Sequence, residues 1–448
     1  MKFNIDTQTF RDLNIFTSSH DAEAISKFFR CTKTIGGRES MLEMMNNPVA
    51  DISLLRDRTA SIRYFSTDKI TLSITNNQLD LIEHYLKYDK KYLKNNLIDA
   101  AADYITNLFR NGDQYYIITA GIKNLINLFS TINVYTLEIA KSDAPLYLQR
   151  QAVRINEIVD IIMPGGFTNL TNKKLKFYKI NHLDTVFKQK HKEILKELLT
   201  LVYELDVFET LAFVAEDKKM CFASYLEDGP MRLQVEGLYH PGIKNPVVND
   251  INLKEDLNMT FLTGSNMAGK SSILKAVGIS IYLAHIGFPI FAAKMTTTAF
   301  NGLITTINLP DNLGEGLSHY YTEVKRVKQA AKALSDHNKM FVIFDELFRG
   351  TNVKDAFDAS LLIISELTKI KNSAFFISTH IVELADELGS FNNVAFKYMD
   401  TYFENSKPIF TYKLLEGISK ERLGMYIVQN EGIIEIIKRA AENQNNLQ

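Results

Sequence analysis

The pattern of hydrophobic and polar positions divides the chain into two parts. In the first part, five apolar residues recur at intervals of three and four and therefore share one helix face: Leu195, Leu198, Leu199, Val202 and Leu205. Only seven of the 21 glycines precede residue 236, and no proline occurs between Pro48 and Pro145. We therefore predict a helical first part, with one long helix from about His191 to Phe208.

The second part alternates short β-prone runs with helical segments, which predicts βαβ units and a mostly parallel sheet. The predicted strands are Met259–Thr263, Gly302–Asn308, Met340–Asp345, Ala374–Ser378 and Asn393–Met399. Two further short strands, Cys221–Leu226 and Met231–Gly237, are predicted between the two parts. We predict an all-α domain over residues 1–215 and an α/β domain with C-terminal helices over residues 216–448.

Composition and charge mainly exclude certain classes of protein. The 448 residues are 46% hydrophobic and 23% charged, which excludes disordered, collagen-like and disulfide-stapled proteins. The net charge is −1, so a surface for nucleic acid has to be a local patch. Cys31 and Cys221 are the only cysteines, which favours a reducing compartment, and the N-terminal residues lack a signal-peptide pattern. We expect a cytoplasmic protein.

One motif points to nucleotide chemistry. Residues 264–271 read G-x-x-x-x-G-K-S, directly after one predicted strand and before a helix. In this Walker A pattern, backbone N–H groups bind phosphate oxygens, Lys270 reaches the β- and γ-phosphates and Ser271 ligates Mg²⁺. The uncharged stretch Ala276–Ala293 has the minimum length of a membrane span. Because it begins inside the helix of this motif and contains Gly287 and Pro289, we predict a buried helix and no membrane contact.

A second motif supplies carboxylates. Four apolar residues, Phe341–Phe344, lead into Asp345 and Glu346, which is the Walker B pattern. Asp345 would hold Mg²⁺, and Glu346 would orient or deprotonate the attacking water. Acidic residues also end many ordinary strands, but the position downstream of a phosphate loop favours a catalytic role.

Two other segments lie where ligands of open α/β sheets bind. His380 follows the apolar run Ala374–Ile377 and would lie at the carboxyl end of a neighbouring strand. Ser318 ends a glycine-containing segment that precedes a helix running to about Asp336. A serine at a helix start could bind an anion or simply cap the helix.

In order and spacing, these segments resemble the ATPase domain of the MutS family, a branch of the ABC-type ATPases: TGSNMAGKSS, EGLSHYYTEV, FVIFDELFRGTNVKDA and ISTHIVEL. The likeness extends to EGLYHPGIKNPVV and LLEGISKERLGMYIV, and residues 25–65 are similar to the opening of the family's core domain. The resemblance implies a multidomain protein in which an all-α core and lever domain precedes an α/β P-loop ATPase domain of the ABC type.

The resemblance also implies roles for individual residues. Glu346 would activate water, His380 would sense the γ-phosphate, and Ser318 would act on the nucleotide of a second subunit, which implies a homodimer. Ser271 and Asp345 would hold Mg²⁺, and Asn266 would change position between nucleotide states. ATP would bind at Gly264, Ser265, Asn266, Met267, Ala268, Gly269, Lys270, Ser271 and Ser272.

The sequence departs from the family's pattern at three places. The family's mismatch-reading domain, with its Phe-x-Glu wedge, has no counterpart in these residues, so we expect no intrinsic mismatch specificity. Val247 and Val248 stand near the position where an aromatic usually stacks on adenine, which predicts an apolar base pocket. Ser265 and Ala268 replace the usual proline and glycine of the phosphate loop.

Two lysine-rich segments are candidate DNA contacts, although solvated helices carry such faces as well. Lys87, Lys90, Lys91 and Lys94 share one helix face, and residues 173–196 contain eight lysines against two acidic residues. We hypothesise an ATP-gated dimeric clamp on duplex or branched DNA that serves repair or recombination with partner proteins. The alternative is an ATP-gated protein-interaction module that has lost DNA binding. A transporter's ATPase subunit would leave the core-domain likeness unexplained.

Overall fold

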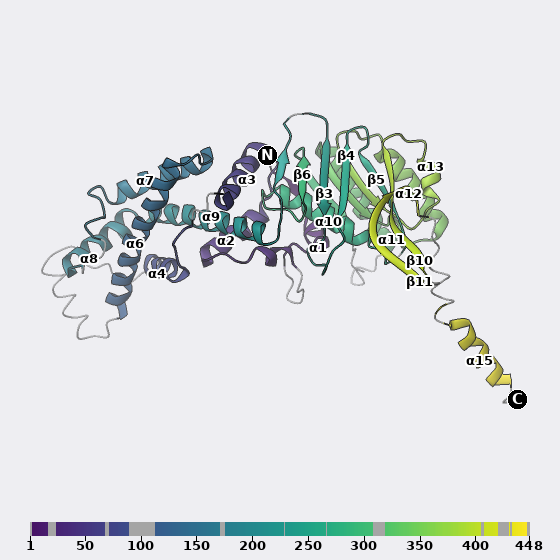
Figure 1. The fold of residues 1–448 in the computed structure, drawn as a ribbon, viewed down its shortest axis with the longest axis horizontal. Helices are drawn as coiled ribbons and strands as arrows, with labels where there is room; N and C mark the ends of the chain where they lie inside the picture. The colour runs from purple at the N-terminus through teal and green to yellow at the C-terminus, as the bar shows by residue number, and fades with distance from the viewer. Residues whose placement is uncertain are drawn as a thin grey trace.

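The computed structural model describes residues 2–16, 24–67, 71–88, 113–170, 175–227, 229–265, 267–307, 319–404, 407–419, 430 and 432–445. The molecule is elongated, with helices gathered at one end and two sheets at the other (Figure 1). It has a mixed fold of helices and strands.

Helices dominate the first 217 residues. They are α1 (Thr7–Asp12), α2 (Ile35–Asn46), α3 (Ile52–Thr67), α4 (Asn76–Lys87), α6 (Asp113–Lys141), α7 (Leu146–Ile162), α8 (Phe177–Asp184) and α9 (Lys192–Asp217), with a 3-10 helix at Ile25–Phe29 and a π-helical turn at Thr185–Lys190. The apolar stripe predicted from Leu195 to Leu205 lies on α9 and is buried. Helix α9 packs against α2, α3 and α7 and leads toward the sheets (Figure 1).

Among the described residues, one helix, Tyr115–Lys141 within α6, has the length and apolar composition that crossing a membrane would require. Its side chains Ile122, Leu125 and Phe129 are buried in the protein core, and α6 packs against α4 and α7. Core helices pass the same test of length and composition, so this helix is weak evidence for a membrane span. The uncharged stretch after the phosphate loop is buried from Ala276 to Ala292, as predicted, but only its first part is helical, because the helix ends at Ala284.

The larger sheet has seven strands in the order β1-β7-β8-β9-β5-β10-β11. Neighbouring strands are parallel except for the antiparallel pair β10 and β11, which confirms the predicted, mostly parallel sheet. The strands are β1 (Asn4–Ile5), β5 (Met259–Thr263), β7 (Gly302–Thr306), β8 (Met340–Asp345), β9 (Ala374–Ser378), β10 (Val394–Glu404) and β11 (Lys407–Glu416).

The central strands β5, β7, β8 and β9 are buried on both faces, which explains why they read as continuous apolar runs. Helix α10 (Lys270–Ala284) and the helical end of the molecule cover one face. On the other face lie α11 (His319–Asp336), α12 (Val353–Leu367) and α13 (Leu384–Leu388). This arrangement places the loops at the carboxyl ends of the strands along one edge.

A smaller sheet of four strands has the order β2-β6-β3-β4. Its strands are β2 (Ala223–Tyr225), β3 (Arg232–Leu238), β4 (Asn249–Lys254) and β6 (Lys294–Thr297). Strand β4 contacts β11 of the larger sheet. Both predicted strands between the two parts are present as β2 and β3.

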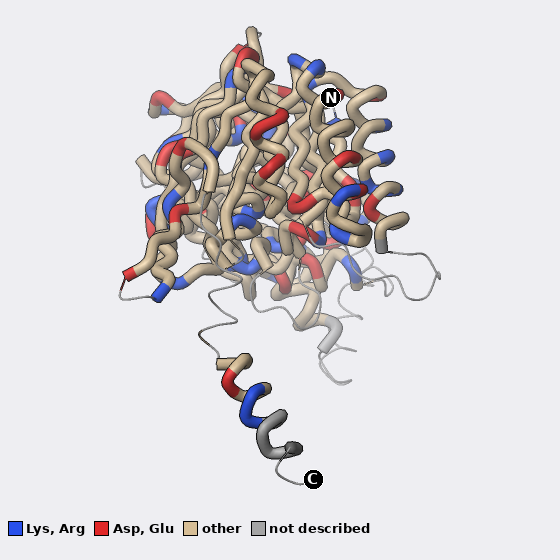
Figure 2. Tube along the Cα trace, turned by 90° about the vertical axis from the view of Figure 1, so that its right-hand side faces the viewer, with Lys and Arg blue, Asp and Glu red and all other residues tan. Residues whose placement is uncertain are grey.

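The N-terminal residues lie with the larger sheet and not with the helical end. Strand β1 extends the sheet by pairing with β7, and α1 packs beside β7. The prediction that these residues belong to the helical first part is therefore wrong, because a two-residue strand has no hydrophobic alternation that could reveal it. At the other end of the chain, α15 (Ile433–Asn445) projects away from the body of the molecule (Figures 1 and 2).

Candidate functional site: a phosphate loop beside an acidic strand end

The phosphate loop joins β5 to α10. Gly264 and Gly269 have φ angles of 148° and 101°, which glycine adopts without strain from a side chain. Gly269 is the residue before α10, so the unpaired N–H groups and the dipole of this helix face the loop. The backbone thus forms a site suited to an anion.

Lys270 begins α10 and is almost fully buried. Its Nζ donates hydrogen bonds to the carbonyl oxygens of Gly264, at 2.7 Å, and Ser265, at 3.3 Å. The same Nζ lies 3.8 Å from Glu346 Oε1. Burial lowers the pKa of Lys270, and the nearby charges of Glu346 and Asp345 oppose this shift. The ammonium group is therefore held at the inner side of the loop.

A hydroxyl and a carboxylate meet next to Lys270. Ser271 Oγ donates to Asp345 Oδ2 at 2.5 Å, and Ser378 Oγ donates to the other carboxylate oxygen. Strand β9 lies between β5 and β8, so Ser378 at its end reaches Asp345 from the side.

These oxygens fit Mg²⁺, which takes few protein ligands and completes its coordination with phosphate and water. In the described part of the chain, no group of three or more His, Cys, Asp or Glu side chains could hold a metal alone. Mg²⁺ would therefore be shared between Ser271, Asp345 and the bound nucleotide.

Glu346 follows Asp345 and takes a left-handed backbone conformation, with φ at 57°. Its backbone N–H donates to the Ser378 carbonyl at 2.9 Å. Its Oε2 lies 2.8 Å from Arg349 Nε and 3.3 Å from His380 Nδ1. Burial raises the pKa of Glu346, but the His380 hydrogen bond and the charges of Arg349, His380 and Lys270 outweigh it, so the pKa falls below its usual 4.5. The side chain is a carboxylate at neutral pH, as a general base must be.

A cavity of about 400 Å³ opens beside the phosphate loop. This volume lies in the range of small-molecule sites. Met267, Gly269 and Ser272 form its loop side, and Val247 and Tyr412 contribute from other elements. His240 also lines it, and burial lowers the pKa of this histidine to about 4, so its ring is neutral. The cavity could accept the base of a nucleotide whose phosphates occupy the loop.

The structure brings together most of the residues that the sequence singled out. Lys270, Ser271, Asp345, Glu346 and His380 converge at the ends of β5, β8 and β9. Ala268 is buried in the turn, and the buried Ser265 hydroxyl has no hydrogen-bond partner among the described residues. Two predicted site residues, Asn266 and Ser318, lie outside the described residues.

Three further residues of the site, Arg349, Ser378 and Tyr412, have no role predicted from the sequence. Arg349 had a local signal, because it lies three residues after Glu346 in the segment that follows the acidic pair. Ser378 contacts Asp345 only because β9 adjoins β8. Tyr412 reaches the cavity from β11, and Asn249 fixes this strand by donating to the Tyr412 carbonyl at 3.0 Å.

A parallel sheet with a glycine-rich loop between strand and helix, beside an acidic strand end, is typical of α/β nucleotide-binding proteins. Residues 260–448 match the family model described as MutS domain V. The DNA mismatch repair protein MutS of Thermotoga maritima is 30% identical over 259 residues, which cover 57% of this chain and 32% of that protein.

Two further proteins of the same description are similar to this chain. The MutS of Geobacillus thermodenitrificans is 24% identical over 339 residues, covering 72% of this chain and 37% of the relative. The MutS of Shouchella clausii is 28% identical over 257 residues, covering 55% and 29%. The chain is therefore similar to MutS proteins, and its residues 260–448 match their domain V. The matched segments span about a third of the length of these relatives.

Proposed function

We propose that this chain binds ATP with Mg²⁺ at the Gly264–Ser272 loop and hydrolyses it to ADP and phosphate. One observation carries the proposal: Lys270, Ser271, Asp345 and Glu346 meet at one edge of the sheet, with Nζ of Lys270 3.8 Å from Glu346 Oε1 and Oγ of Ser271 2.5 Å from Asp345 Oδ2. These are the positive charge, metal ligands and base that phosphoryl transfer to water requires.

Each side chain would have one task. Lys270 places a buried positive charge against the β- and γ-phosphates, and Ser271 and Asp345 hold the metal ion. Mg²⁺, when bound, offsets charge on the phosphate oxygens. Glu346 accepts the proton of the attacking water, and Arg349 and His380 keep this carboxylate charged and oriented. His380 is half exposed, which leaves its ring accessible to the γ-phosphate.

The adenine base would occupy the cavity beside the loop. Val247 lines the cavity, whereas Val248 does not. Two tyrosines, Tyr239 and Tyr412, also line it, and Tyr412 lies against the phosphate loop at Gly269. Val247, Met267 and Tyr412 supply the apolar contacts for the base.

Loss of the loop lysine tests nucleotide binding directly. Lys270→Ala should weaken the affinity for ATP by at least about tenfold, because a charge-assisted contact contributes roughly 1.5–3 kcal/mol. Titration of the protein with ATP and Mg²⁺ in a calorimeter measures this affinity. Lys332→Ala, an exposed lysine on α11, is the control and should bind ATP like the parent protein. Equal affinity in all three proteins would refute the assignment of the loop.

We further propose that ATP opens and closes a homodimeric clamp around duplex or branched DNA through contacts to phosphates. The relatives' description as DNA mismatch repair proteins and the resemblance of residues 25–65 to the core domain support this view. A rival proposal is an ATP-gated protein-interaction module that keeps the ATP-driven motion and has lost DNA binding.

The distribution of lysines bears on this choice. Lys188 is buried, lies 3.9 Å from Asp184 and donates to the Tyr88 carbonyl, so it does not belong to a DNA-facing patch. Lys87 pairs with Glu83 and Lys196 with Glu193. Lys90, Lys91, Lys94, Lys173 and Lys174 lie outside the described residues.

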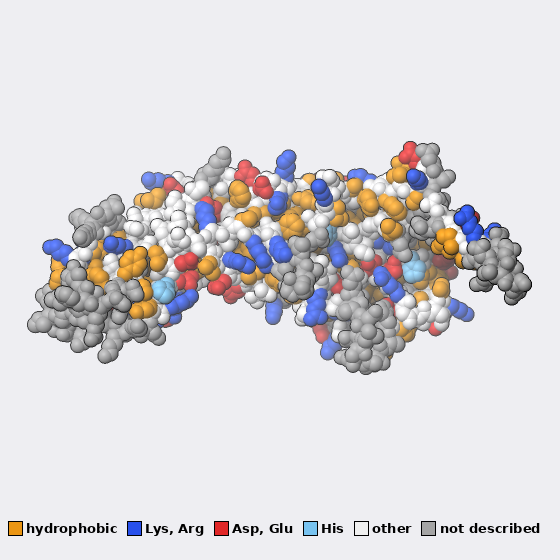
Figure 3. Space-filling model, turned by 90° about the horizontal axis from the view of Figure 1, so that it is seen from below, with side chains coloured by type: hydrophobic (Ala, Val, Ile, Leu, Met, Phe, Trp, Pro, Cys, Tyr) orange, Lys and Arg blue, Asp and Glu red, His pale blue; other side chains and the backbone are white. Residues whose placement is uncertain are grey.

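Positive side chains are spread along the molecule among acidic and hydrophobic ones in the view of Figure 3. Binding of a labelled DNA duplex and a four-way junction at increasing salt separates the two proposals. A clamp that contacts several phosphates loses affinity steeply with salt, whereas an interaction module shows no salt-dependent DNA binding at all.

A further inference from the structure

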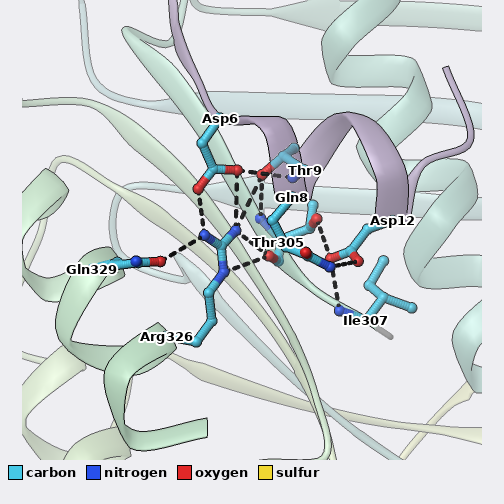
Figure 4. A network of polar contacts seen from close by, with 8 residues as sticks. All are labelled: Asp6, Gln8, Thr9, Asp12, Thr305, Ile307, Arg326 and Gln329. Atoms are coloured by element: carbon cyan, nitrogen blue, oxygen red, sulfur yellow. Dashed lines mark hydrogen bonds and ion pairs between the residues drawn. The ribbon is translucent and has the colours of Figure 1, made fainter. Parts of the chain in front are cut away.

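The N-terminal residues of the chain are bound to helix α11 through a buried arginine (Figure 4). Arg326 of α11 is 4% exposed. Its guanidinium group contacts both carboxylate oxygens of Asp6 and donates to the Thr305 carbonyl through Nη2, at 2.6 Å, and Nε, at 3.2 Å. A planar guanidinium held by a carboxylate and a carbonyl has one preferred orientation, so this contact fixes α11 against β7.

A second carboxylate of the same segment holds the end of β7. Asp12 is buried and accepts hydrogen bonds from Thr305 Oγ1, at 2.7 Å, and from the Ile307 backbone N–H, at 2.9 Å. Gln8 donates to the other Asp12 oxygen at 2.7 Å. Asp6 and Asp12 thus connect the N-terminal segment to both β7 and α11 (Figure 4).

The same helix reaches the acidic strand end. Glu323 lies three residues before Arg326, and both are buried. Its carboxylate oxygens accept hydrogen bonds from the backbone N–H groups of Arg349, at 3.2 Å, and Gly350, at 3.3 Å. The Arg349 side chain in turn lies 2.8 Å from Glu346. Asp6 is therefore connected to Arg326 by polar contacts, Arg326 to Glu323 by one turn of α11, and Glu323 to Arg349 and Glu346 again by polar contacts.

The loop after the acidic pair is held both by packing and by these contacts. A cavity of about 120 Å³ lies between it, the end of β7 and α11, lined by Thr306, Glu323, Glu346 and Arg349 among others. Leu347 and Phe348 of this loop are buried in the core, whereas Arg349 and Gly350, which follow them, are exposed. The two hydrogen bonds from Glu323 therefore hold the part of the loop, Arg349 and Gly350, that lies outside the packed core.

We propose that Asp6 is a positioning residue for the site: acting through Arg326 and Glu323, it sets the place of Arg349 and so of the Glu346 carboxylate. The kinetic consequence rests on the proposed ATPase function, whereas the structural consequence does not. Removing the charge of Asp6 leaves a buried guanidinium without its nearest carboxylate, which is costly, so α11 should shift.

Hydrogen exchange of backbone amides tests the structural part in the full chain. In Asp6→Asn, the peptide spanning residues 347–352 should exchange at least about threefold faster, since weaker Glu323 contacts release the Arg349 and Gly350 amides. Peptides from α7, at the helical end, should not change. Arg11→Ala removes an exposed charge from the same N-terminal helix and should leave the exchange at 347–352 unaltered.

Steady-state ATP hydrolysis tests the kinetic part. Asp6→Asn should lower kcat by about tenfold and change KM by less than about twofold, since the base and not the nucleotide loop is displaced. Asp6→Glu should restore more than half of the lost rate. In an Arg349→Ala background, Asp6→Asn should lower kcat by less than about twofold further, because residues that act through one another are not additive. Arg326→Lys keeps the charge but loses the forked contact, and serves in place of Asp6→Asn if that variant does not fold.

Three results would overturn the proposal. The first is a folded Asp6→Asn protein whose hydrogen exchange at residues 347–352 is unchanged. The second is a double variant, Asp6→Asn with Arg349→Ala, whose loss of kcat equals the product of the two single losses. The third is an Asp6→Asn protein that loses as much ATP affinity as kcat. A parent protein that does not hydrolyse ATP would refute the proposed function, and the exchange experiment would still decide whether Asp6 controls the loop.

Discussion

At the scale of single residues, the charge state of Glu346 depends on its neighbours. Burial alone would raise its pKa, and Arg349, His380 and Lys270 reverse this effect. Arg349 forms the shortest of the ion pairs to this carboxylate, at 2.8 Å. The charge of the Glu346 carboxylate therefore depends on side chains that single substitutions can remove.

This balance predicts a change in pH dependence. Without Arg349, the pKa of Glu346 should rise, because burial is then less opposed. The acid limb of kcat for ATP hydrolysis in Arg349→Ala should consequently move to higher pH than in the parent protein, and Arg349→Lys should move it less. Rates between pH 4.5 and 8 measure the shift. An acid limb that stays in place, or moves to lower pH, would contradict the proposed control of Glu346.

The residues of the site differ in how far the sequence could predict them. The phosphate loop is a local motif, so the positions of Lys270 and Ser271 follow from short-range spacing. The contact of Ser378 with Asp345 requires β9 to lie between β5 and β8, and Tyr412 reaches the cavity only through the β10–β11 pair. Pairing of strands that are distant in sequence leaves no signal in the spacing of residues, so these contacts could not be predicted.

At the scale of elements, helix α10 connects the phosphate loop to the helical end of the molecule. Near its carboxyl end, the Tyr282 hydroxyl donates to the Met45 carbonyl at 2.6 Å, and the Val49 N–H donates to the His285 carbonyl at 2.7 Å. The His285 ring is fully buried and its Nε2 accepts from the Phe300 N–H at 2.9 Å. The hydrophobic pattern predicts the strands and the long helices. It cannot predict these connections between helices, because each depends on single polar atoms.

The buried His285 predicts acid sensitivity of the fold. Burial lowers its pKa from 6.5 to about 4. Between these pH values the unfolded chain binds more protons than the folded one. The free energy of unfolding therefore decreases as pH falls from about 6.5 toward 4, by up to roughly 3 kcal/mol. His240 shifts in the same direction and adds to the loss. His285→Gln should be less stable at pH 7 but lose less stability between pH 7 and 5, as measured by urea unfolding. His337→Gln is an exposed control, and its free energy of unfolding should depend on pH as in the parent protein. The same pH dependence in His285→Gln would contradict this role of His285.

At the scale of the whole molecule, the proposed dimer requires a residue from each subunit at every nucleotide. Ser318 would supply the second subunit's contribution, following the MutS resemblance. A mixture of Lys270→Ala chains with Ser318→Arg chains would then contain heterodimers in which one composite site carries both defects and the other carries neither. Some hydrolysis should return on mixing two inactive proteins. A mixture that exchanges subunits and stays inactive would argue against the shared site.

If Lys270, Ser271, Asp345 and Glu346 form a site for ATP hydrolysis with Glu346 as base, removing this carboxylate should slow hydrolysis and leave ATP binding intact. Single-turnover hydrolysis of ATP by Glu346→Gln, with the ATP affinity measured alongside, tests it most directly. We expect an affinity unchanged within about twofold and a rate at least about a hundredfold lower, the scale of losing a general base. Glu387→Gln, an exposed control on α13, should hydrolyse ATP at the parent rate. A Glu346→Gln protein that hydrolyses ATP at nearly the parent rate would contradict the account.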